Sequence, residues 1–156
     1  MQIKIAGLVQ DSIVDGPGMR LTVFFQGCPH RCEGCHNPQT HDFYGGTEMD
    51  TAEVLDKLRR NPLLSGITLS GGEPFAQPEA AFELACGAKA QGKSVWVYSG
   101  YMHEQLLRQE AARRVLDVCD VLVDGPFILA QKTLNLKWRG SWNQRVIELK
   151  GGKDNG

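Results

Sequence analysis

The chain has 156 residues, of which 22% are charged and 42% hydrophobic, and its formal net charge at pH 7 is −1. This length is typical of one compact domain and is too short for a complete (β/α)8 barrel, which needs about 250 residues. The charge balance excludes a general nucleic-acid binder, and the composition excludes a disordered chain. There is no membrane-length apolar run, and residues 1–6 show no signal peptide. We expect a cytoplasmic protein with a single domain over residues 1–150 and a flexible tail over 151–156.

Strand and helix signals alternate along the first half of the chain. Residues Ile3–Val9 predict an edge strand, and the β-branched and aromatic run Leu21–Phe25 predicts a buried strand. Asp50, three positions before Glu53, predicts the start of a helix. The Asn61-Pro62 pair predicts its end, because the residue before a proline disfavours helical backbone.

The same alternation continues in the second half. A strand over Ile67–Leu69 is followed by a helix that begins at Pro78. A strand over Val95–Tyr98 precedes a third helix over Met102–Leu116. The last two predicted strands are Val121–Val123 and Val146–Leu149. The helical positions expected in the core are Val54, Leu55, Leu58, Ala81, Leu84, Ala85, Ala88, Leu106, Leu107 and Val115.

This order of elements predicts an α/β fold with a mostly parallel sheet, because strands that alternate with helices form right-handed βαβ units. Unusual loops follow four of the strands, at Gly27–Asn37, Ser70–Phe75, Ser99–Gly100 and Asp124–Phe127. The carboxyl ends of parallel strands share one edge of a sheet, where ligands gather. We therefore expect these loops to converge.

The first of these loops carries three cysteines, Cys28, Cys32 and Cys35, in the spacing C-x3-C-x2-C. A short loop of this kind can point three thiolates at one iron–sulfur cluster, which takes thiolate ligands. Three ligands are one too few for a four-iron cube, and an open iron can bind a small molecule. The other two cysteines, Cys86 and Cys119, are expected to be small buried hydrophobic residues.

Three other interpretations of the cysteines stay open. A structural zinc site could recruit His36 or His41, although such sites usually join two ligand pairs that are far apart in sequence. Cys32 and Cys35 also form a C-x-x-C pair typical of thiol–disulfide oxidoreductases, which leaves Cys28 unexplained. The cysteines could finally be structural, with no ligand.

A second notable loop, Ser70-Gly71-Gly72-Glu73-Pro74, follows the next strand. Its two glycines let the backbone approach a ligand closely and adopt positive φ. Alone, this pattern is also typical of an ordinary strand-to-helix turn. Its weight comes from its occurrence together with the cysteine loop at one predicted edge.

Together the two loops resemble the radical S-adenosylmethionine (SAM) superfamily, whose C-x3-C-x2-C and Gly-Gly-Glu-Pro motifs fall here at Cys28–Cys35 and Gly71–Pro74. The chain is similar to the branch that activates anaerobic ribonucleoside-triphosphate reductase. Four segments carry this narrower resemblance: Asp15–Arg20, Cys35–Pro38, Asp120–Phe127 and Arg139–Ile147. They extend over nearly the whole chain.

The resemblance implies a radical SAM core built as an incomplete, open β/α barrel. It implies that Cys28, Cys32 and Cys35 hold a 4Fe-4S cluster whose fourth iron chelates SAM. The implied SAM-binding residues are Ser70, Gly71, Gly72, Glu73, Ser99 and Gly100. The backbone of residues 70–73 would receive the methionyl amino group, with Glu73 as a further acceptor.

Some residues near the implied site have two interpretations. Ser99 either meets SAM or caps the following helix. His30 and His36 flank the cysteines, where they either hydrogen-bond the cluster sulfurs or only make the loop polar.

The implied activity is the reductive cleavage of SAM to methionine and a 5′-deoxyadenosyl radical, with an electron from a donor such as flavodoxin. That radical would take a hydrogen atom from a glycine of the partner, anaerobic ribonucleoside-triphosphate reductase. An activase of another glycyl radical enzyme, such as pyruvate formate-lyase, is an alternative, although those activases are generally longer. Outside the superfamily, a thiol oxidoreductase and a zinc-stabilised binding module remain. No nucleic-acid or membrane partner is expected.

An aromatic and cationic group lies near the carboxyl end, at Trp138, Arg139, Trp142 and Arg145. Tryptophan and arginine are enriched at interfaces, so this group is a candidate docking surface for the partner. Packing beneath a loop is the competing interpretation.

Overall fold

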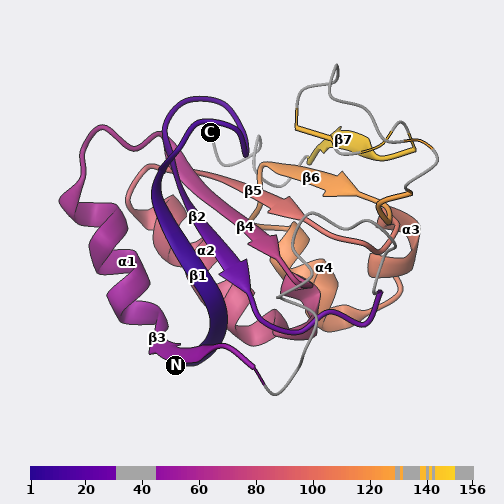
Figure 1. The fold of residues 1–156 in the computed structure, drawn as a ribbon, viewed down its shortest axis with the longest axis horizontal. Helices are drawn as coiled ribbons and strands as arrows, with labels where there is room; N and C mark the ends of the chain where they lie inside the picture. The colour runs from indigo at the N-terminus through magenta and orange to yellow at the C-terminus, as the bar shows by residue number, and fades with distance from the viewer. Residues whose placement is uncertain (31–44, 129–130, 132–137, 140, 142, 150–156) are drawn as a thin grey trace.

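The computed structural model describes residues 1–30, 45–128, 131, 138–139, 141 and 143–149. Its strands are β1 (Gln2–Ser12), β2 (Arg20–Phe25), β3 (Thr47–Asp50), β4 (Gly66–Gly71), β5 (Ser94–Tyr98), β6 (Val121–Asp124) and β7 (Arg145–Glu148). Its helices are α1 (Thr51–Arg60), the short 3₁₀ turn η2 (Pro74–Ala76), α2 (Pro78–Ala90), α3 (His103–Leu106) and α4 (Glu110–Leu116). All the strands belong to one sheet in the order β3-β1-β2-β4-β5-β6-β7 (Figure 1).

The sheet is mixed, which corrects the expectation of a mostly parallel one. Strands β2, β4, β5 and β6 are parallel, whereas β1 is antiparallel to both β2 and β3, and β7 is antiparallel to β6. The connection from β1 to β2 spans only residues 13–19. This is shorter than the dozen or so residues that a parallel crossover needs. The expectation of an edge strand at Ile3–Val9 is also wrong, because β3 pairs along the outer side of β1.

The ends of α1 and α2 confirm the predicted helix signals. The Asp50 carboxylate accepts a hydrogen bond from the backbone N–H of Ala52 at 2.9 Å and so caps α1. That helix ends just before Asn61. Pro78 begins α2, and Gly92, with a φ of +74°, follows its end. Left-handed backbone of this kind is cheapest for glycine.

The expectation of one continuous third helix is wrong. The backbone N–H groups of Arg108 and Gln109 donate to carbonyls three residues earlier, which tightens the turn and ends α3. A separate helix, α4, then begins at Glu110. Leu107 lies in the turn with 44% of its surface exposed, so it is not a core residue, whereas Leu106 is buried as expected.

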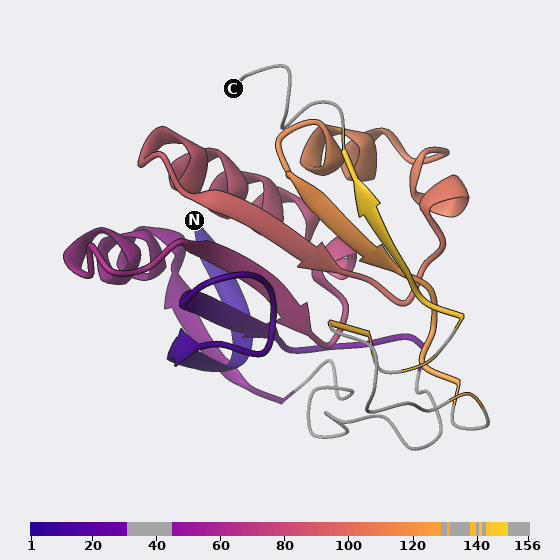
Figure 2. The ribbon, with the colours of Figure 1, turned by 90° about the horizontal axis from the view of Figure 1, so that it is seen from above.

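Helices α1, α2 and α4 lie in a row on one face of the sheet (Figure 2). The strands alternate side chains between the two faces, and the apolar set faces the helices. The buried core includes Leu21, Val23, Phe25, Val54, Leu58, Ile67, Leu69, Leu84, Val95 and Val115. Cys119 is buried as expected, but Cys86 is partly exposed. Among the helices of the described residues, none combines the length and apolar character needed to cross a membrane.

The arrowheads of β2, β4, β5 and β6 point to the same end of the molecule (Figure 1). This is the geometry expected when parallel strands share one carboxyl edge. The loops that follow these strands are therefore brought to that edge.

Candidate functional site

The cysteine loop and the glycine loop begin side by side at this edge. The N–H of Gly72 donates to the carbonyl of Phe25, and the N–H of Glu73 donates to the carbonyl of Gly27, each at 2.8 Å. A Cβ on Gly72 would lie 2.4 Å from the Gly27 oxygen, closer than real Cβ atoms approach. The glycine at this position is required because the two backbones touch. Ser70 and Gly71, the last residues of β4, pair in register with the end of β2.

Glu73 lies at the centre of the site. Its side chain has no exposed surface. The carboxylate accepts hydrogen bonds from the Ser99 hydroxyl at 2.9 Å, from the Gly100 N–H at 2.8 Å and from the Phe75 N–H at 3.1 Å. The Nε2 atom of His30 lies 2.6 Å from Oε1. A carboxylate has about four lone-pair positions, so these partners leave it saturated. A buried carboxylate requires such partners.

The expected convergence of the loops is thereby present for three of them. His30 comes from the cysteine loop, Glu73 from the glycine loop, and Ser99 and Gly100 from the loop after β5. The expectation that Ser99 caps the next helix is wrong, because α3 begins at His103 with Met102 as its N-cap residue. The Ser99 hydroxyl instead accepts from the Tyr101 N–H at 3.0 Å while it donates to Glu73.

Cys28 follows Gly27 directly after β2 and is 7% exposed. Gly27 has a φ of +101°, which turns the chain sharply at this point. The pKa of the nearby Tyr101 hydroxyl is raised, mainly by burial and further by the charges of Glu73 and Cys28. A thiolate donor shielded from water at the carboxyl edge fits one corner of an iron–sulfur cluster.

Cys32 and Cys35 lie outside the described residues, as does His36. Within the described ranges, the structure brings together no set of three His, Cys, Asp or Glu side chains that could hold a metal ion. Only one of the three predicted cysteine ligands belongs to those ranges.

The sequence analysis did not identify Glu73 as the hydrogen-bond partner of His30. Its Nε2 nitrogen is directed at Glu73, and its ring meets Tyr101 edge-on with the centroids 4.5 Å apart. One interpretation of the sequence has His30 hydrogen-bonding the cluster sulfurs. There is no local signal for a contact with Glu73, which is 43 positions away. The close contact of this ring with Gly100 is likewise a product of the fold.

The fourth loop is held by a second buried carboxylate. Asp124 has no exposed surface, and it accepts from the His103 N–H at 2.7 Å and from Arg145 Nε at 3.0 Å. Arg145 also reaches Glu104, at 2.9 Å. The hydrogen bonds that Arg145 donates to Asp124 first, and then to Glu104, raise the pKa of Arg145. The segment from Asp124 is therefore anchored by an ion pair with Arg145, which sequence reasoning missed.

Two of the four segments that carry the narrower resemblance, Asp120–Phe127 and Arg139–Ile147, contact one another. The side-chain amide of Asn143 donates to the Pro126 carbonyl at 2.8 Å, and that of Gln144 donates to the Gly125 carbonyl at 3.0 Å. The Gly125 N–H in turn donates to the Tyr101 carbonyl at 3.1 Å. The fourth loop is thus tied both to the C-terminal motif and to the loop after β5.

The residues of the candidate docking surface have different surroundings in the structure. The ring of Trp138 packs edge-on against Trp96, with centroids 4.8 Å apart, which favours the packing interpretation for this residue. Arg139 donates to the Gln144 carbonyl at 3.1 Å. Trp142 lies outside the described residues.

The Asp15–Arg20 motif lies at the amino end of the strands, opposite the edge that carries the candidate site. Arg20 is fully buried and donates to the Thr68 hydroxyl at 2.8 Å, the Ser94 hydroxyl at 2.9 Å and the Ile67 carbonyl at 2.9 Å. Burial is the main cause that lowers its pKa to about 10. The guanidinium therefore joins β2, β4 and β5 where they begin, away from the candidate site.

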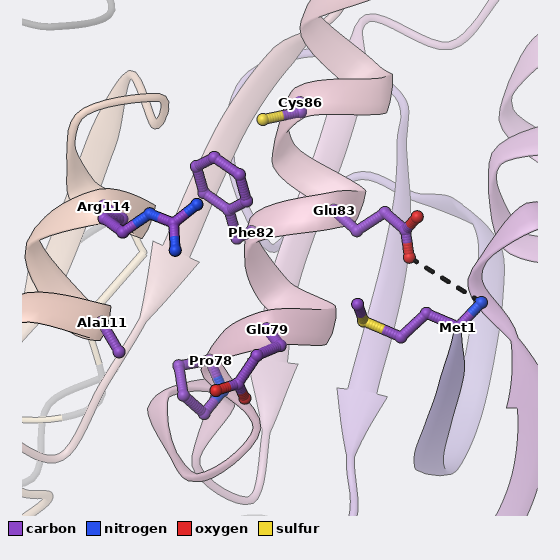
Figure 3. Close-up of a pocket in the computed structure, with 8 residues that line it drawn as sticks. All are labelled: Met1, Pro78, Glu79, Phe82, Glu83, Cys86, Ala111 and Arg114. Atoms are coloured by element: carbon purple, nitrogen blue, oxygen red, sulfur yellow. Dashed lines mark ion pairs between the residues drawn. The ribbon is translucent and has the colours of Figure 1, made fainter.

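A pocket of about 370 Å³ lies on the helix side of the molecule (Figure 3). It is lined by Met1, Pro78, Glu79, Phe82, Glu83, Cys86, Ala111 and Arg114. Arg114 stacks over the Phe82 ring at 4.7 Å, and the amino group of Met1 lies 3.9 Å from Glu83. None of the predicted site residues lines this pocket.

Comparisons with known proteins show the family of the chain. A family model described as a 4Fe-4S single cluster domain matches residues 14–147. The chain is 38% identical to the anaerobic ribonucleoside-triphosphate reductase-activating protein of Salmonella typhimurium, over 88% of this chain and 94% of that protein. The identity to the protein of the same name from Escherichia coli K12 is 37%, with the same coverage.

The chain is also similar to a phage protein and, in fold, to a solved structure. The protein of this name from Enterobacteria phage T4 is 36% identical over 85% of this chain and 86% of its own. Among solved structures, QueE from Escherichia coli is similar in fold, with a TM-score of 0.53 and 13% identity over 80% of this chain and 70% of QueE. The chain therefore belongs to the 4Fe-4S single cluster domain family and to the family of anaerobic ribonucleoside-triphosphate reductase-activating proteins.

Proposed function

We propose that this chain is a radical SAM activase that generates a glycyl radical on anaerobic ribonucleoside-triphosphate reductase. The observation that carries the proposal is the meeting of the cysteine loop and the Gly-Gly-Glu-Pro loop at Glu73, in a chain whose relatives bear the name of that activity. A 4Fe-4S cluster with bound SAM supplies the reductive carbon–sulfur cleavage and the hydrogen-abstracting 5′-deoxyadenosyl radical.

In this proposal Cys28, Cys32 and Cys35 hold the cluster. The backbone of Ser70, Gly71, Gly72 and Glu73 receives the methionyl amino group of SAM. Because the Glu73 carboxylate is saturated by internal donors, its task is to fix the shape of that backbone rather than to take the amino group itself. Ser99 and Gly100 contribute to SAM binding by holding Glu73.

The proposal extends to the whole domain and its surroundings. Residues 1–150 form a single minimal radical SAM domain, and the sheet is an incomplete barrel whose open side admits a glycine-bearing loop of the reductase. Support for the open side comes from the linear strand order, in which β3 and β7 are the end strands of the described sheet. A cytoplasmic flavoprotein such as flavodoxin delivers the electron.

Anaerobic reconstitution with iron and sulfide tests the cluster. The wild-type chain is expected to turn brown, with broad absorbance that bleaches in air, and Cys28→Ser is expected to lose the colour. Cys86→Ser is the matched control, because Cys86 lies on the helix side and is expected to leave the colour unchanged. A colourless protein with stoichiometric zinc would instead identify a zinc module. Disulfide exchange that survives Cys28→Ser would identify a thiol oxidoreductase.

A second experiment tests the reaction and the partner. The reduced, reconstituted chain is mixed with SAM and the reductase, and the glycyl radical is sought by electron spin resonance while methionine and 5′-deoxyadenosine are quantified. A pyruvate formate-lyase type enzyme replaces the reductase in a parallel sample. Radical formation on that enzyme alone would assign the chain to the alternative partner, and no cleavage of SAM at all would contradict the proposed function.

A further inference from the structure

We propose that His30 is a positioning residue for SAM binding, which acts by tying the base of the cysteine loop to the buried carboxylate of Glu73. The inference rests on the proposed function and deepens it. It assigns to His30 a task that is separate from ligation of the cluster.

The contact between these residues is short and sheltered. His30 Nε2 lies 2.6 Å from Glu73 Oε1, and the two side chains are 15% and 0% exposed. The same carboxylate already accepts from the Gly100 N–H, the Ser99 hydroxyl and the Phe75 N–H, and the His30 tautomer with its proton on Nε2 supplies the fourth donor. Hydrogen bonds of this charge-assisted kind are about twice as strong as neutral ones.

The surroundings fit the imidazole closely. A Cβ on Gly100 would lie 2.3 Å from a ring carbon of His30, so this glycine leaves room for the ring. The edge of Tyr101 supports it from the neighbouring loop, at 4.5 Å between centroids. The ring is therefore fixed by packing as well as by its hydrogen bond, which is what a positioning role requires.

Glu73 passes this restraint to the segment that faces SAM in the proposed function. Its carboxylate accepts from Phe75, Ser99 and Gly100, and its N–H donates to the Gly27 carbonyl. His30 follows Gly27 by three positions, so the chain closes a small loop from Gly27 to Glu73 and back through His30. This closed arrangement holds the start of the cysteine loop, residues 27–30, and the glycine loop at one separation.

Two substitutions separate the hydrogen bond from the packing. His30→Phe keeps an aromatic ring against Tyr101 but has no donor, whereas His30→Gln keeps a side-chain N–H donor without the ring. His103→Gln, at the start of α3, is the matched control for the change in residue type. SAM affinity is measured by anaerobic equilibrium dialysis with labelled SAM on the reconstituted, unreduced proteins, together with iron content and the thermal midpoint of the cluster-free chains.

We expect His30→Phe to weaken SAM binding about tenfold, the usual effect of losing a hydrogen bond to a charged group. The SAM affinity of His30→Gln is expected to stay within about threefold of wild type, because this variant keeps a side-chain donor. The same is expected of His103→Gln, which leaves His30 unchanged. Equal SAM affinity in wild type and His30→Phe would overturn the inference. Equal losses in the Phe and Gln variants would also overturn it, because packing alone would then explain them.

A double-mutant cycle locates the effect at Glu73. On a Glu73→Gln background, His30→Phe is expected to cost less than about twofold in SAM affinity, since the partner charge has gone. An undiminished tenfold effect there would overturn the assignment to Glu73. If the wild-type chain loads iron and binds SAM, and the His30 variants bind SAM equally well, this inference alone is overturned. If the wild-type chain takes up no cluster, the proposed function is overturned.

Discussion

Arg145 reaches across from β7 to the buried carboxylate of Asp124 at the end of β6, with Nε 3.0 Å from Oδ1. The two strands are adjacent and antiparallel, and these residues are partners in their register. The pair anchors the loop that starts at Asp124 at the same edge as the cysteine and glycine loops. Arg145 is one of the residues that the sequence predicts as a docking surface near the carboxyl end.

Loss of this anchor should destabilise the fold. Arg145→Ala is expected to lower the free energy of unfolding by about 2–3 kcal/mol, because it leaves the Asp124 carboxylate buried with one of its partners removed. Glu104→Ala is the matched control, because it removes only the exposed partner of Arg145 and should cost less stability than Arg145→Ala. Urea unfolding followed by circular dichroism measures both, and equal losses would contradict the assignment of the main contact to Asp124.

The Glu104 contact should be visible in the pH dependence of stability. The hydrogen bond from Arg145 is the main cause that lowers the pKa of Glu104 from 4.5 to about 2. A carboxyl whose pKa is lower in the folded state stabilises above its unfolded pKa and loses that contribution as the pH falls. The stability difference between wild type and Glu104→Gln is therefore expected to shrink between about pH 4.5 and pH 2.

Salt gives an independent check on the same pair. Glu104 is exposed, so its interaction with Arg145 is screened when the Debye length falls to about 3 Å in 1 M salt. The pH-dependent difference should then almost disappear. A difference that persists in high salt would mean that screening does not reach the pair.

Arg20 should be a stability residue rather than a site residue. Arg20→Met keeps most of the side-chain volume but removes the donors to Thr68, Ser94 and the Ile67 carbonyl. We expect a loss of about 2–4 kcal/mol in the free energy of unfolding, because buried acceptors are left without partners. Reconstituted Arg20→Met that still folds at low temperature should bind SAM within about twofold of wild type, because substitution effects at separated sites are nearly independent. A selective loss of SAM affinity at unchanged stability would contradict this role.

The contact between the cysteine loop and the glycine loop predicts that a methyl group added at Gly72 lowers stability. Gly72→Ala places a Cβ 2.4 Å from the Gly27 carbonyl oxygen, a backbone atom that cannot rotate away. We expect a loss of about 1–3 kcal/mol in stability, typical of overpacking, together with weaker SAM binding. Gly7→Ala is the matched control, since a Cβ there meets nothing within 4 Å. Thermal unfolding and SAM dialysis on both variants test this.

Local patterns in the sequence were enough to find most of the elements and the loops that converge at the candidate site. The run from Leu21 to Phe25, the cap at Asp50 and the proline at Pro78 act within a few residues of themselves, so they can be interpreted without the fold. Because parallel strands share a carboxyl edge, the placement of Ser70–Phe75 and Ser99–Gly100 after strands also predicted their convergence.

Other features were decided only in three dimensions. Strand β3 has the sequence Thr-Glu-Met-Asp, which shows no apolar alternation, and it forms because it pairs with β1. That pairing also moved β1 away from the sheet edge. The break between α3 and α4 depends on a turn that leaves Leu107 exposed, which helical periodicity does not distinguish from a buried position.

The sequence by itself determined which segments reach the candidate site: the loop that begins with Gly27 and Cys28, and the Gly-Gly-Glu-Pro loop. Only the tertiary structure decided that His30 meets Glu73, 43 positions away, and that Asp124 meets Arg145, 21 positions away. The physical reason is that hydrophobic period and capping act over a turn or a strand, whereas a buried carboxylate takes whichever donors the packed chain brings to it.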